Sequence, residues 1–153
     1  MVVSRPLVRI ATVAANQTWP LRLSVMWPDK PLEYVQLAED EVPSGVVHFG
    51  LFVADELEPC SVCSLFFQQP REAQFRKLCT EQARQGRGYG TALLQHVFDY
   101  AASSSVDRIW CNARNDKASF YRRSFGMKTA ANSRFERGGL EYVVMEKDLS
   151  PHR

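Results

Sequence analysis

The chain has 153 residues and a net charge of +2, with 45% hydrophobic and 24% charged residues, a composition typical of one globular domain. We therefore expect one domain over residues 1–149 with a loose tail at 150–153, and the small net charge argues against binding of nucleic acid or a membrane. The sequence has no apolar run of 18 residues and no secretory signal at its start, so a cytoplasmic location is expected.

The N-terminal half is predicted to form strands around an acidic excursion. Residues 5–13 have the pattern of a strand, and residues 18–27 that of a short helix that ends before a proline. Residues 29–44 combine two prolines with several acidic side chains, which indicates a mostly irregular segment with one helical turn that could serve as a lid. Three strands are then expected over residues 46–54, 60–68 and 74–80. The turn-like segments between them indicate an antiparallel meander.

The C-terminal half alternates helices and strands. A glycine-rich loop leads into a helix with a regular apolar face, which serines at 103–105 end. A strand over 106–113 precedes a helix over 117–125, which Asn115 or Asp116 can cap and Gly126 can close. A further strand begins near Met127, and residues 134–149 are predicted to form a hairpin around two glycines. This order predicts an α/β fold, with helices on both faces of a mixed, mostly antiparallel sheet.

The cysteines lie within apolar segments. In a reducing compartment we expect buried free thiols at these four positions, Cys60, Cys63, Cys79 and Cys111. The first two have the spacing of half a zinc site, but no second pair of ligands follows, and no metal is expected.

The stretch "RQGRGYGT", Arg84 to Thr91, has the chemistry of an anion site. A helix start leaves its first backbone N–H groups unpaired, glycines let a ligand approach the backbone, and Arg84 and Arg87 add positive charge. A diphosphate suits such a loop, although a tight strand-to-helix turn would also require glycine. No lysine precedes Thr91 and the Gly-x-Gly-x-x-Gly spacing is absent, which argues against a nucleoside triphosphate or dinucleotide site.

The loop also carries a family resemblance. "QGRGYG" has a Gln-x-x-Gly-x-Gly pattern and resembles the acyl-CoA pyrophosphate loop of the GNAT superfamily of N-acetyltransferases. "NARNDKASFYRRSFGM" resembles the superfamily's later motif, and two motifs in the right order are more specific than either alone. The segments "LRLSVMWP", "HFG", "FRKLCT", "IWCNAR" and "YVVMEKDL" are similar to the glyphosate N-acetyltransferase type of small-molecule enzyme. The resemblance covers most of the chain outside residues 29–44.

The resemblance implies acetyl-CoA as the cofactor, lying between two splayed central strands. It assigns to the cofactor Leu78, Cys79 and Thr80 on a strand, Gln85, Gly86, Arg87, Gly88, Tyr89, Gly90 and Thr91 in the loop, and Asn115, Ser119 and Arg122 near the later helix. Arg122 or its neighbour Arg123 would reach the nucleotide phosphate, or the two would form a solvated basic helix face.

The resemblance further implies direct attack of an amine on the thioester, with Tyr121 as the acid that protonates the leaving thiolate. Otherwise Tyr121 only anchors its helix in the core. Tyr142 stands where the related branch has a histidine base. It is our first candidate for the base, with Glu141 acting through water, or solvent itself, as alternatives. His48 is a remote candidate and fits a structural role better.

The resemblance assigns Arg76 and Arg114 to the acid group of a small substrate, since guanidinium groups bind carboxylates in a bidentate manner. Both arginines could instead pair with carboxylates of the fold. Trp27 replaces a third arginine of the related branch, and Arg22 is either a further substrate contact or a surface charge. The expected acceptor is a small, anionic or amino-acid-like amine. A peptide or protein acceptor and a noncatalytic CoA-binding module are alternatives, and a homodimer is plausible from the resemblance.

Overall fold

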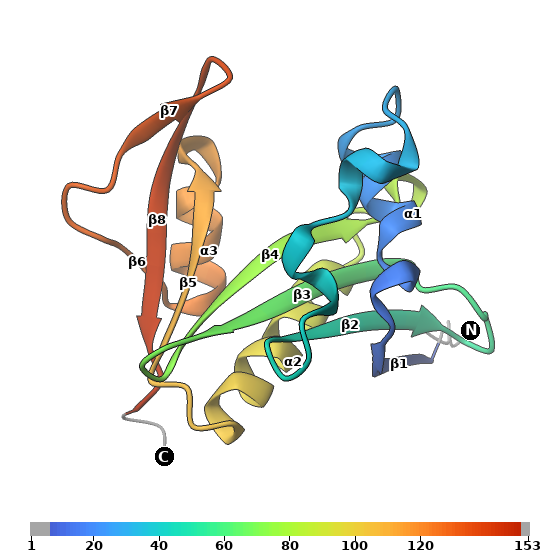
Figure 1. Cartoon of the computed structure of the whole chain (residues 1–153), viewed down its shortest axis with the longest axis horizontal. Coiled ribbons are helices and arrows are strands. Elements are labelled where there is room, and N and C mark those ends of the chain that lie inside the picture. Colours follow the sequence, from blue (N-terminus) through green and yellow to red (C-terminus); the bar gives the residue numbers. More distant parts are fainter. Residues whose placement is uncertain (1–6, 151–153) are drawn as a thin grey trace, which may run out of the picture.

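The computed structural model describes residues 7–150, which form one eight-stranded sheet (Figure 1). Its strands are β1 (Val8–Val13), β2 (Val46–Val53), β3 (Ser61–Gln68), β4 (Glu72–Thr80), β5 (Arg108–Arg114), β6 (Lys128–Thr129), β7 (Phe135–Arg137) and β8 (Leu140–Asp148). They lie in the order β1-β2-β3-β4-β5-β8-β6, and β7 pairs with β8. The β4–β5 pair is parallel and the other pairs are antiparallel, so the sheet is mixed and mostly antiparallel, as predicted.

The sheet splits between its two central strands. β4 and β5 pair only over Glu72–Gln74 and Arg108–Trp110, at the start of each strand. Beyond that point each strand follows its outer neighbour, because β4 stays paired with β3 up to Thr80 and β5 stays paired with β8 up to Arg114. The two halves of the sheet therefore diverge as two arms, and Figure 1 shows the V-shaped separation between them.

Helical segments cover both faces of the sheet, as predicted. The longest is α2 (Tyr89–Ser103), and α3 (Ala118–Phe125) follows β5. The short α1 (Trp19–Leu21) continues into a π-helical turn, η2 (Arg22–Met26). Successive side chains of a strand point to opposite faces. Cys63 packs in the core beneath α2, and its neighbour Val62 packs against Leu21 of α1, so these helices lie on opposite faces.

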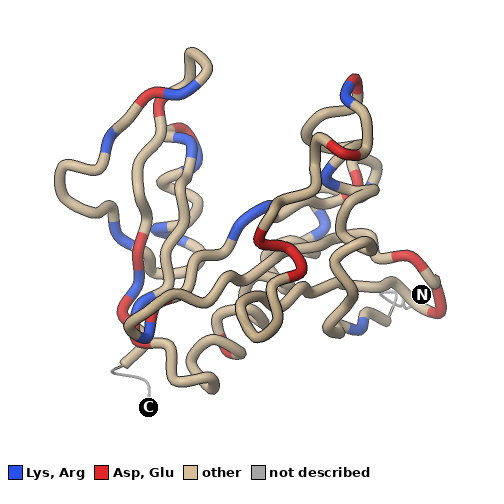
Figure 2. The backbone as a smooth tube through the Cα atoms, in the orientation of Figure 1, with Lys and Arg blue, Asp and Glu red and all other residues tan. Residues whose placement is uncertain are grey.

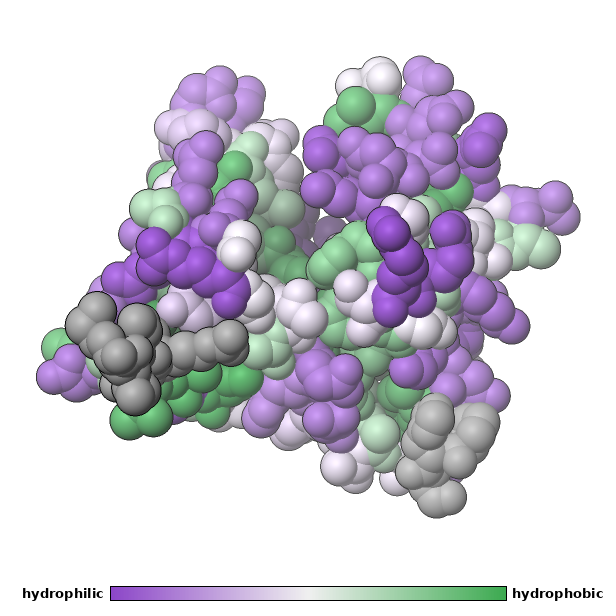
Figure 3. All heavy atoms as spheres, turned by 180° about the vertical axis from the view of Figure 1, so that it is seen from behind, coloured by the Kyte–Doolittle hydropathy of each residue, from purple (hydrophilic) through white to green (hydrophobic). Residues whose placement is uncertain are grey.

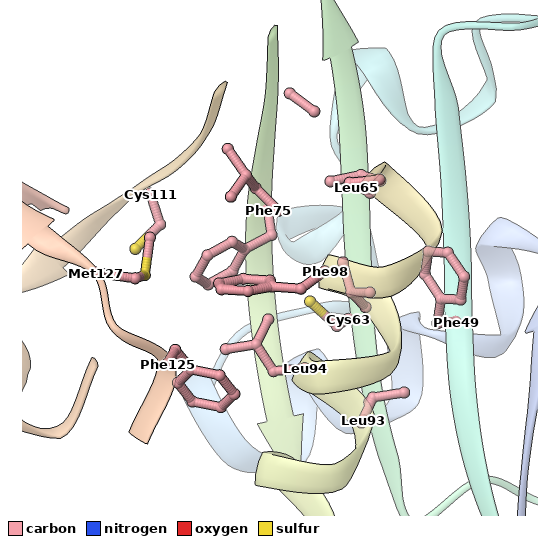
Figure 4. Packing of buried hydrophobic residues seen from close by; sticks show 14 of the residues in the cluster. Phe49, Cys63, Leu65, Phe75, Leu93, Leu94, Phe98, Cys111, Phe125 and Met127 are labelled. Atoms are coloured by element: carbon pink, nitrogen blue, oxygen red, sulfur yellow. The ribbon is translucent and has the colours of Figure 1, made fainter. Parts of the chain in front are cut away.

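The main core lies between the sheet and the two helices α2 and α3. Phe75 of β4 meets Phe98 of α2 with ring centroids 5.8 Å apart, and Phe98 meets Phe125 of α3 at 5.3 Å (Figure 4). Edge-to-face and tilted pairs of this kind are favourable for aromatic rings. This continuous packing joins α3 on one arm to β4 on the other. All four cysteines are buried, as predicted, and free.

The sequence located most elements within a few residues. The meander, α2, the hairpin between β7 and β8, and the left-handed Gly126 (φ 68°) after α3 are confirmed. The cap prediction is wrong, because Asn115 and Asp116 form a 3-10 turn, η6 (Asn115–Lys117), and no side chain caps α3. The start of the first predicted strand and residues 151–153 of the expected tail lie outside the described residues. Between residues 7 and 150, no helix is both long and apolar enough to cross a membrane.

The acidic excursion is more ordered than predicted. It contains two 3-10 turns, η3 (Leu32–Val35) and η4 (Ala38–Glu41), instead of one helical turn. Its Asp40 side chain is buried and bonded to the guanidinium of Arg22. This anchor ties the excursion to the sheet, and none of its residues lines the cleft described below. The expectation of a lid is therefore not met.

Candidate active site

A cavity of about 980 Å³ lies between the two arms. Its walls are β4 from Gln74 to Thr80, β5 from Cys111 to Arg114, the glycine-rich loop before α2, the first turn of α3 and the β7–β8 hairpin. Seen from the opposite side in Figure 3, the surface is hollowed between the arms. Among the described residues, six basic side chains and no acidic side chain or histidine line this cleft. An excess of positive charge in a concave site favours anionic ligands.

The glycine-rich loop presents a run of free backbone donors. The helix α2 begins at Tyr89, and its first turn bond runs from the N–H of Ala92 to the carbonyl of Gly88. Within the described chain, no acceptor bonds the N–H groups of residues 86–91. Six consecutive unpaired donors at the positive end of a helix form a cradle for phosphate oxygens. The donor set fits a diphosphate without any metal.

Two of the loop glycines have backbone conformations that other residues adopt at a cost. Gly86 has φ 82° and Gly88 has φ 85°, both in the left-handed region. A Cβ atom on either would meet no atom within 4 Å, so conformation rather than crowding explains these two glycines. Gly90 differs, because its Cβ would lie 3.2 Å from the hydroxyl of Thr80. Here the first turn of α2 passes close to the end of β4.

The side chains beside the loop provide less positive charge to the cleft than the sequence alone suggests. The guanidinium of Arg84 forms a two-pronged pair with Glu56 at 2.8 Å and lies 3.5 Å from Glu81, so its charge is already compensated. The amide of Gln85 donates to the carbonyl of Thr80 at 3.0 Å and stabilises the turn that follows β4. Arg87 is exposed and makes no ion pair within the described residues. Arg87 is therefore the side chain here that is available to an anion.

The backbone of β4 faces the cleft at alternate residues. The carbonyl of Cys79 accepts from the hydroxyl of Ser61 in β3, so the polar groups of Cys79 point away from the cleft. By alternation the polar groups of Leu78 point to the open edge, and so does the N–H of Thr80, whose carbonyl Gln85 occupies. Leu78, Cys79 and Thr80 all line the cleft, and their assignment to the cofactor stays a prediction.

Tyr121 lines the cleft from the first turns of α3. Its ring packs against Phe75 with centroids 5.9 Å apart, which fixes the phenol between the arms. Burial raises the pKa of Tyr121, and the neighbouring thiols of Cys111 and Cys63 add to the effect. The phenol therefore keeps its proton at neutral pH and can act as a proton donor.

Tyr142 lies on the other arm, in β8 opposite Arg114 of β5. Its ring stacks on that of Phe135 with centroids 5.3 Å apart, and it also lines the cleft. The alternatives are placed elsewhere. Glu141 does not line the cleft, and His48 is buried with both ring nitrogens bonded within the fold. The geometry thus leaves Tyr142 as the base candidate that faces the site.

Three of the four proposed substrate contacts line the cleft. These are Trp27 on one arm, Arg76 on β4, and Arg114 at the end of β5. Arg76 lies 3.6 Å from Glu39, and Arg114 lies 3.7 Å from Asp116. These long pairs with exposed carboxylates are weak and leave both arginines able to exchange partners.

The prediction for the fourth residue, Arg22, is wrong. Arg22 has no exposed surface, and its guanidinium donates to the Asp40 carboxylate at 2.7 and 3.0 Å, to the carbonyl of Val35 and to the hydroxyl of Ser64. It is neither a substrate contact nor a surface charge. Ser64 in turn bonds Nδ1 of His48 at 2.6 Å, and Nε2 of His48 meets the carbonyl of Asp40 at 2.8 Å. The network anchors the acidic excursion against β2 and β3.

The remaining proposed cofactor contacts lie near α3. Asn115 and Arg122 are exposed, and neither they nor Ser119 line the cleft. Ser119 accepts long hydrogen bonds from Arg123, through its carbonyl at 3.4 Å and its hydroxyl at 3.5 Å. Their assignment to the nucleotide end of a cofactor stays a prediction.

Sequence reasoning missed three basic residues in the cleft, of which Lys117 lies at the end of η6. Lys77 lies in β4 between two proposed contacts, and Arg137 ends β7 at the hairpin. Strand alternation from sequence cannot place Lys77, because β4 has an irregular register at this point. Arg137 reaches the cleft because of the length of the β7–β8 hairpin. That length depends on how β7 pairs with β8, which the sequence alone does not show.

Comparisons with known proteins agree with this geometry. The family model described as the acetyltransferase (GNAT) family matches residues 12–127. A curated relative, the uncharacterised N-acetyltransferase YitI of Bacillus subtilis, is 27% identical over 154 residues, which cover 96% of this chain and 100% of the relative.

Two solved structures share the fold. A provisionally named N-acetyltransferase from Lactobacillus plantarum matches with a TM-score of 0.78 and 20% identity, covering 93% of this chain and 98% of the other. FeeM, an N-acyl amino acid synthase from uncultured soil microbes, matches with a TM-score of 0.76 and 10% identity, covering 95% and 93%.

Proposed function

The chain belongs to the acetyltransferase (GNAT) family, and from this premise we propose that it acetylates the amine of a small, anionic or amino-acid-like molecule. As a member of this family it is an acyltransferase that uses an acyl-CoA donor. When bound, acetyl-CoA supplies an acetyl group as a thioester, which an amine can attack directly.

The observation that supports this function is the run of unpaired backbone donors at residues 86–91, at one end of the split between β4 and β5. The donors would hold the diphosphate of the cofactor. The open edge of β4 at Leu78 and Thr80 would hold the arm that carries the thioester, as an added strand does. In our proposal Arg87, Tyr89, Asn115, Ser119 and Arg122 provide the outer contacts.

We assign the proton transfers to the two cleft tyrosines. The new bond joins the acceptor nitrogen to the acetyl carbon, and the carbon–sulfur bond breaks. Tyr142 would take the proton that the amine loses, directly or through water, which requires that its phenol is ionised at that step. Tyr121 would give its phenolic proton to the departing sulfur.

The charge of the cleft supports an anionic acceptor. Six basic and no acidic side chains line the cavity among the described residues, so a basic peptide would meet repulsion. Arg76 and Arg114 are our candidates for the acid group, and the indole of Trp27 for an apolar part. A protein of the same fold, FeeM, is an N-acyl amino acid synthase, which makes an acceptor of this class compatible with the scaffold.

A screen of acetyl-CoA consumption over small amines, amino acids and basic peptides tests the proposal. We expect hits among amines that carry an acid group, with a raised KM in Arg114→Ala. Tyr121→Phe should lower turnover by roughly 10²- to 10⁴-fold, which is typical for loss of a general acid, while acetyl-CoA binding by calorimetry is kept. Hits confined to basic peptides would favour the peptide acceptor. Unchanged turnover in Tyr121→Phe would contradict the assigned acid.

A further inference from the structure

Lys77 occupies an unusual place in β4. Val62 and Ser64 of β3 pair with Cys79 and Arg76 of β4, so two residues of β4, Lys77 and the one after it, lie opposite a single residue of β3. This is a β-bulge, and bulges often redirect a side chain next to an active site. Lys77 also has φ 60°, a left-handed conformation that is unfavourable for a residue with a side chain. The bulge turns its side chain into the cleft.

The ammonium of Lys77 has an aromatic partner but no carboxylate. Its Nζ lies 4.5 Å from the centroid of the Trp27 indole ring. No acidic group of the described residues lies within ion-pair distance of Lys77, in contrast to Arg76, which has Glu39, and Arg114, which has Asp116. Lys77 is therefore a half-buried cation whose charge the protein leaves uncompensated.

Arg137 approaches the same space from the other arm. It ends β7 at a tight hairpin, lines the cleft, and lies over the ring of Phe135 at 5.4 Å. It too makes no ion pair within the described residues. Figure 2 shows a basic segment midway along β4 and another near the tip of the β7–β8 hairpin. The two cations thus line the same cleft, one from each arm.

The electrostatic cost of this arrangement favours an anionic ligand. Burial lowers the pKa of Lys77, and the positive charges of Arg76, Arg22 and Arg137 lower it further. Like charges that converge in a partly desolvated cleft are unfavourable unless a ligand of opposite charge joins them. A carboxylate between Lys77 and Arg137 would relieve this repulsion.

We propose that Lys77 and Arg137 bind the acid group of the acceptor, with the indole of Trp27 against its carbon skeleton. This inference rests on the proposed function and adds Lys77 and Arg137 to Arg76 and Arg114 as groups that bind the carboxylate. It also gives the bulge in β4 a purpose, because a regular strand would alternate the Lys77 side chain away from its present place. A carboxylate bound from both arms would span the cleft between them.

Acceptor pairs that differ only in the acid group test the proposal. An amine from the screen that carries a carboxylate is compared with its carboxamide, in the wild type and in Lys77→Gln and Arg137→Gln. We expect KM for the acid to rise roughly tenfold or more in each variant, as for loss of a charged hydrogen bond, and to change much less for the amide. Calorimetric CoA binding should stay within twofold, which also verifies that each variant is folded.

Lys30→Gln is the matched control. Lys30 also lies over an aromatic ring, with its Nζ 5.3 Å from the centroid of Tyr34, but it does not line the cleft. We expect it to leave both acceptors unaffected.

The outcomes separate the two levels of the proposal. A wild type without preference for the acid over the amide overturns the proposed acceptor class, and this inference with it. A clear preference that survives in both variants overturns only the role of Lys77 and Arg137. An equal fall in kcat for acid and amide in Lys77→Gln would overturn it as well, because it would make Lys77 a proton carrier.

Discussion

Replacing Asp40 with asparagine should lower the free energy of unfolding by roughly 3–5 kcal/mol, the usual cost of leaving a buried charge without its partner. The Asp40 carboxylate accepts two bonds from Arg22, one from the indole N–H of Trp19 at 3.0 Å and one from the N–H of Leu37 at 2.9 Å. The side chains of Arg22 and Asp40 are 0% and 1% exposed. The neutral amide would face a guanidinium that water cannot reach.

The same turn supplies the control. Glu39 precedes Asp40, is 58% exposed and lies 3.6 Å from Arg76, so Glu39→Gln should cost at most about 1 kcal/mol. Urea and thermal unfolding measure both variants, and a loss of 3–5 kcal/mol should lower Tm by roughly 10 °C in a chain of this size. Equal stability of the two variants within 1 kcal/mol would refute the view that the Arg22–Asp40 pair anchors the excursion.

The pH dependence of this effect has a defined sign. Burial by itself raises the pKa of Asp40, but the hydrogen bonds from Arg22 and Leu37 outweigh it and hold the pKa below the ordinary value of 3.8. A lowered pKa contributes stability above pH 3.8 that is lost as the pH falls through the folded value. The advantage of wild type over Asp40→Asn should therefore be full at pH 7 and shrink below pH 3.8.

Three further predictions concern the site. Gly88→Ala should weaken CoA binding by roughly tenfold in calorimetry, because alanine resists φ 85° by about 1–2 kcal/mol; unchanged affinity would contradict the cradle. The rise in the pKa of Tyr121 predicts that a pH–rate profile shows no loss of its proton below pH 10, and a Tyr121-dependent decline near pH 8 would refute this. Burial raises the pKa of Cys79 and Cys111 to about 12, so a thiol reagent at pH 8 should label neither before unfolding.

Local signals in the sequence were enough for most of the fold. The spacing of apolar residues predicted the strands and helices. Gly126 indicated the end of α3, because glycine tolerates φ 68°. The anion-binding character of the glycine-rich loop could also be predicted, because its backbone donors lie within one short segment. Tyr121 could be identified because it belongs to a motif that includes its whole helix.

Long-range pairing determined what the sequence could not show. From the sequence alone, Arg22 is expected at the surface. Its burial is possible because the irregular segment that follows brings the Asp40 carboxylate into contact with its guanidinium. From the sequence alone, Lys77 is expected to be an ordinary residue of a regular strand. The bulge is visible only in the register of β3 against β4. Arg137 reaches the cleft through the length of a hairpin that depends on β7 and β8 pairing. In each case the decisive partner is distant in the chain.

The central claim is that the backbone N–H groups of residues 86–91 hold the diphosphate of coenzyme A. Amide proton–nitrogen NMR spectra test it most directly, with the protein titrated in turn with CoA and with pantetheine, which lacks the diphosphate. CoA should shift the signals of Gly86, Gly88 and Gly90 more than those of the rest of the chain, and pantetheine should leave them nearly unmoved. Shifts of equal size with both compounds, or glycine signals that CoA does not move, would contradict the account.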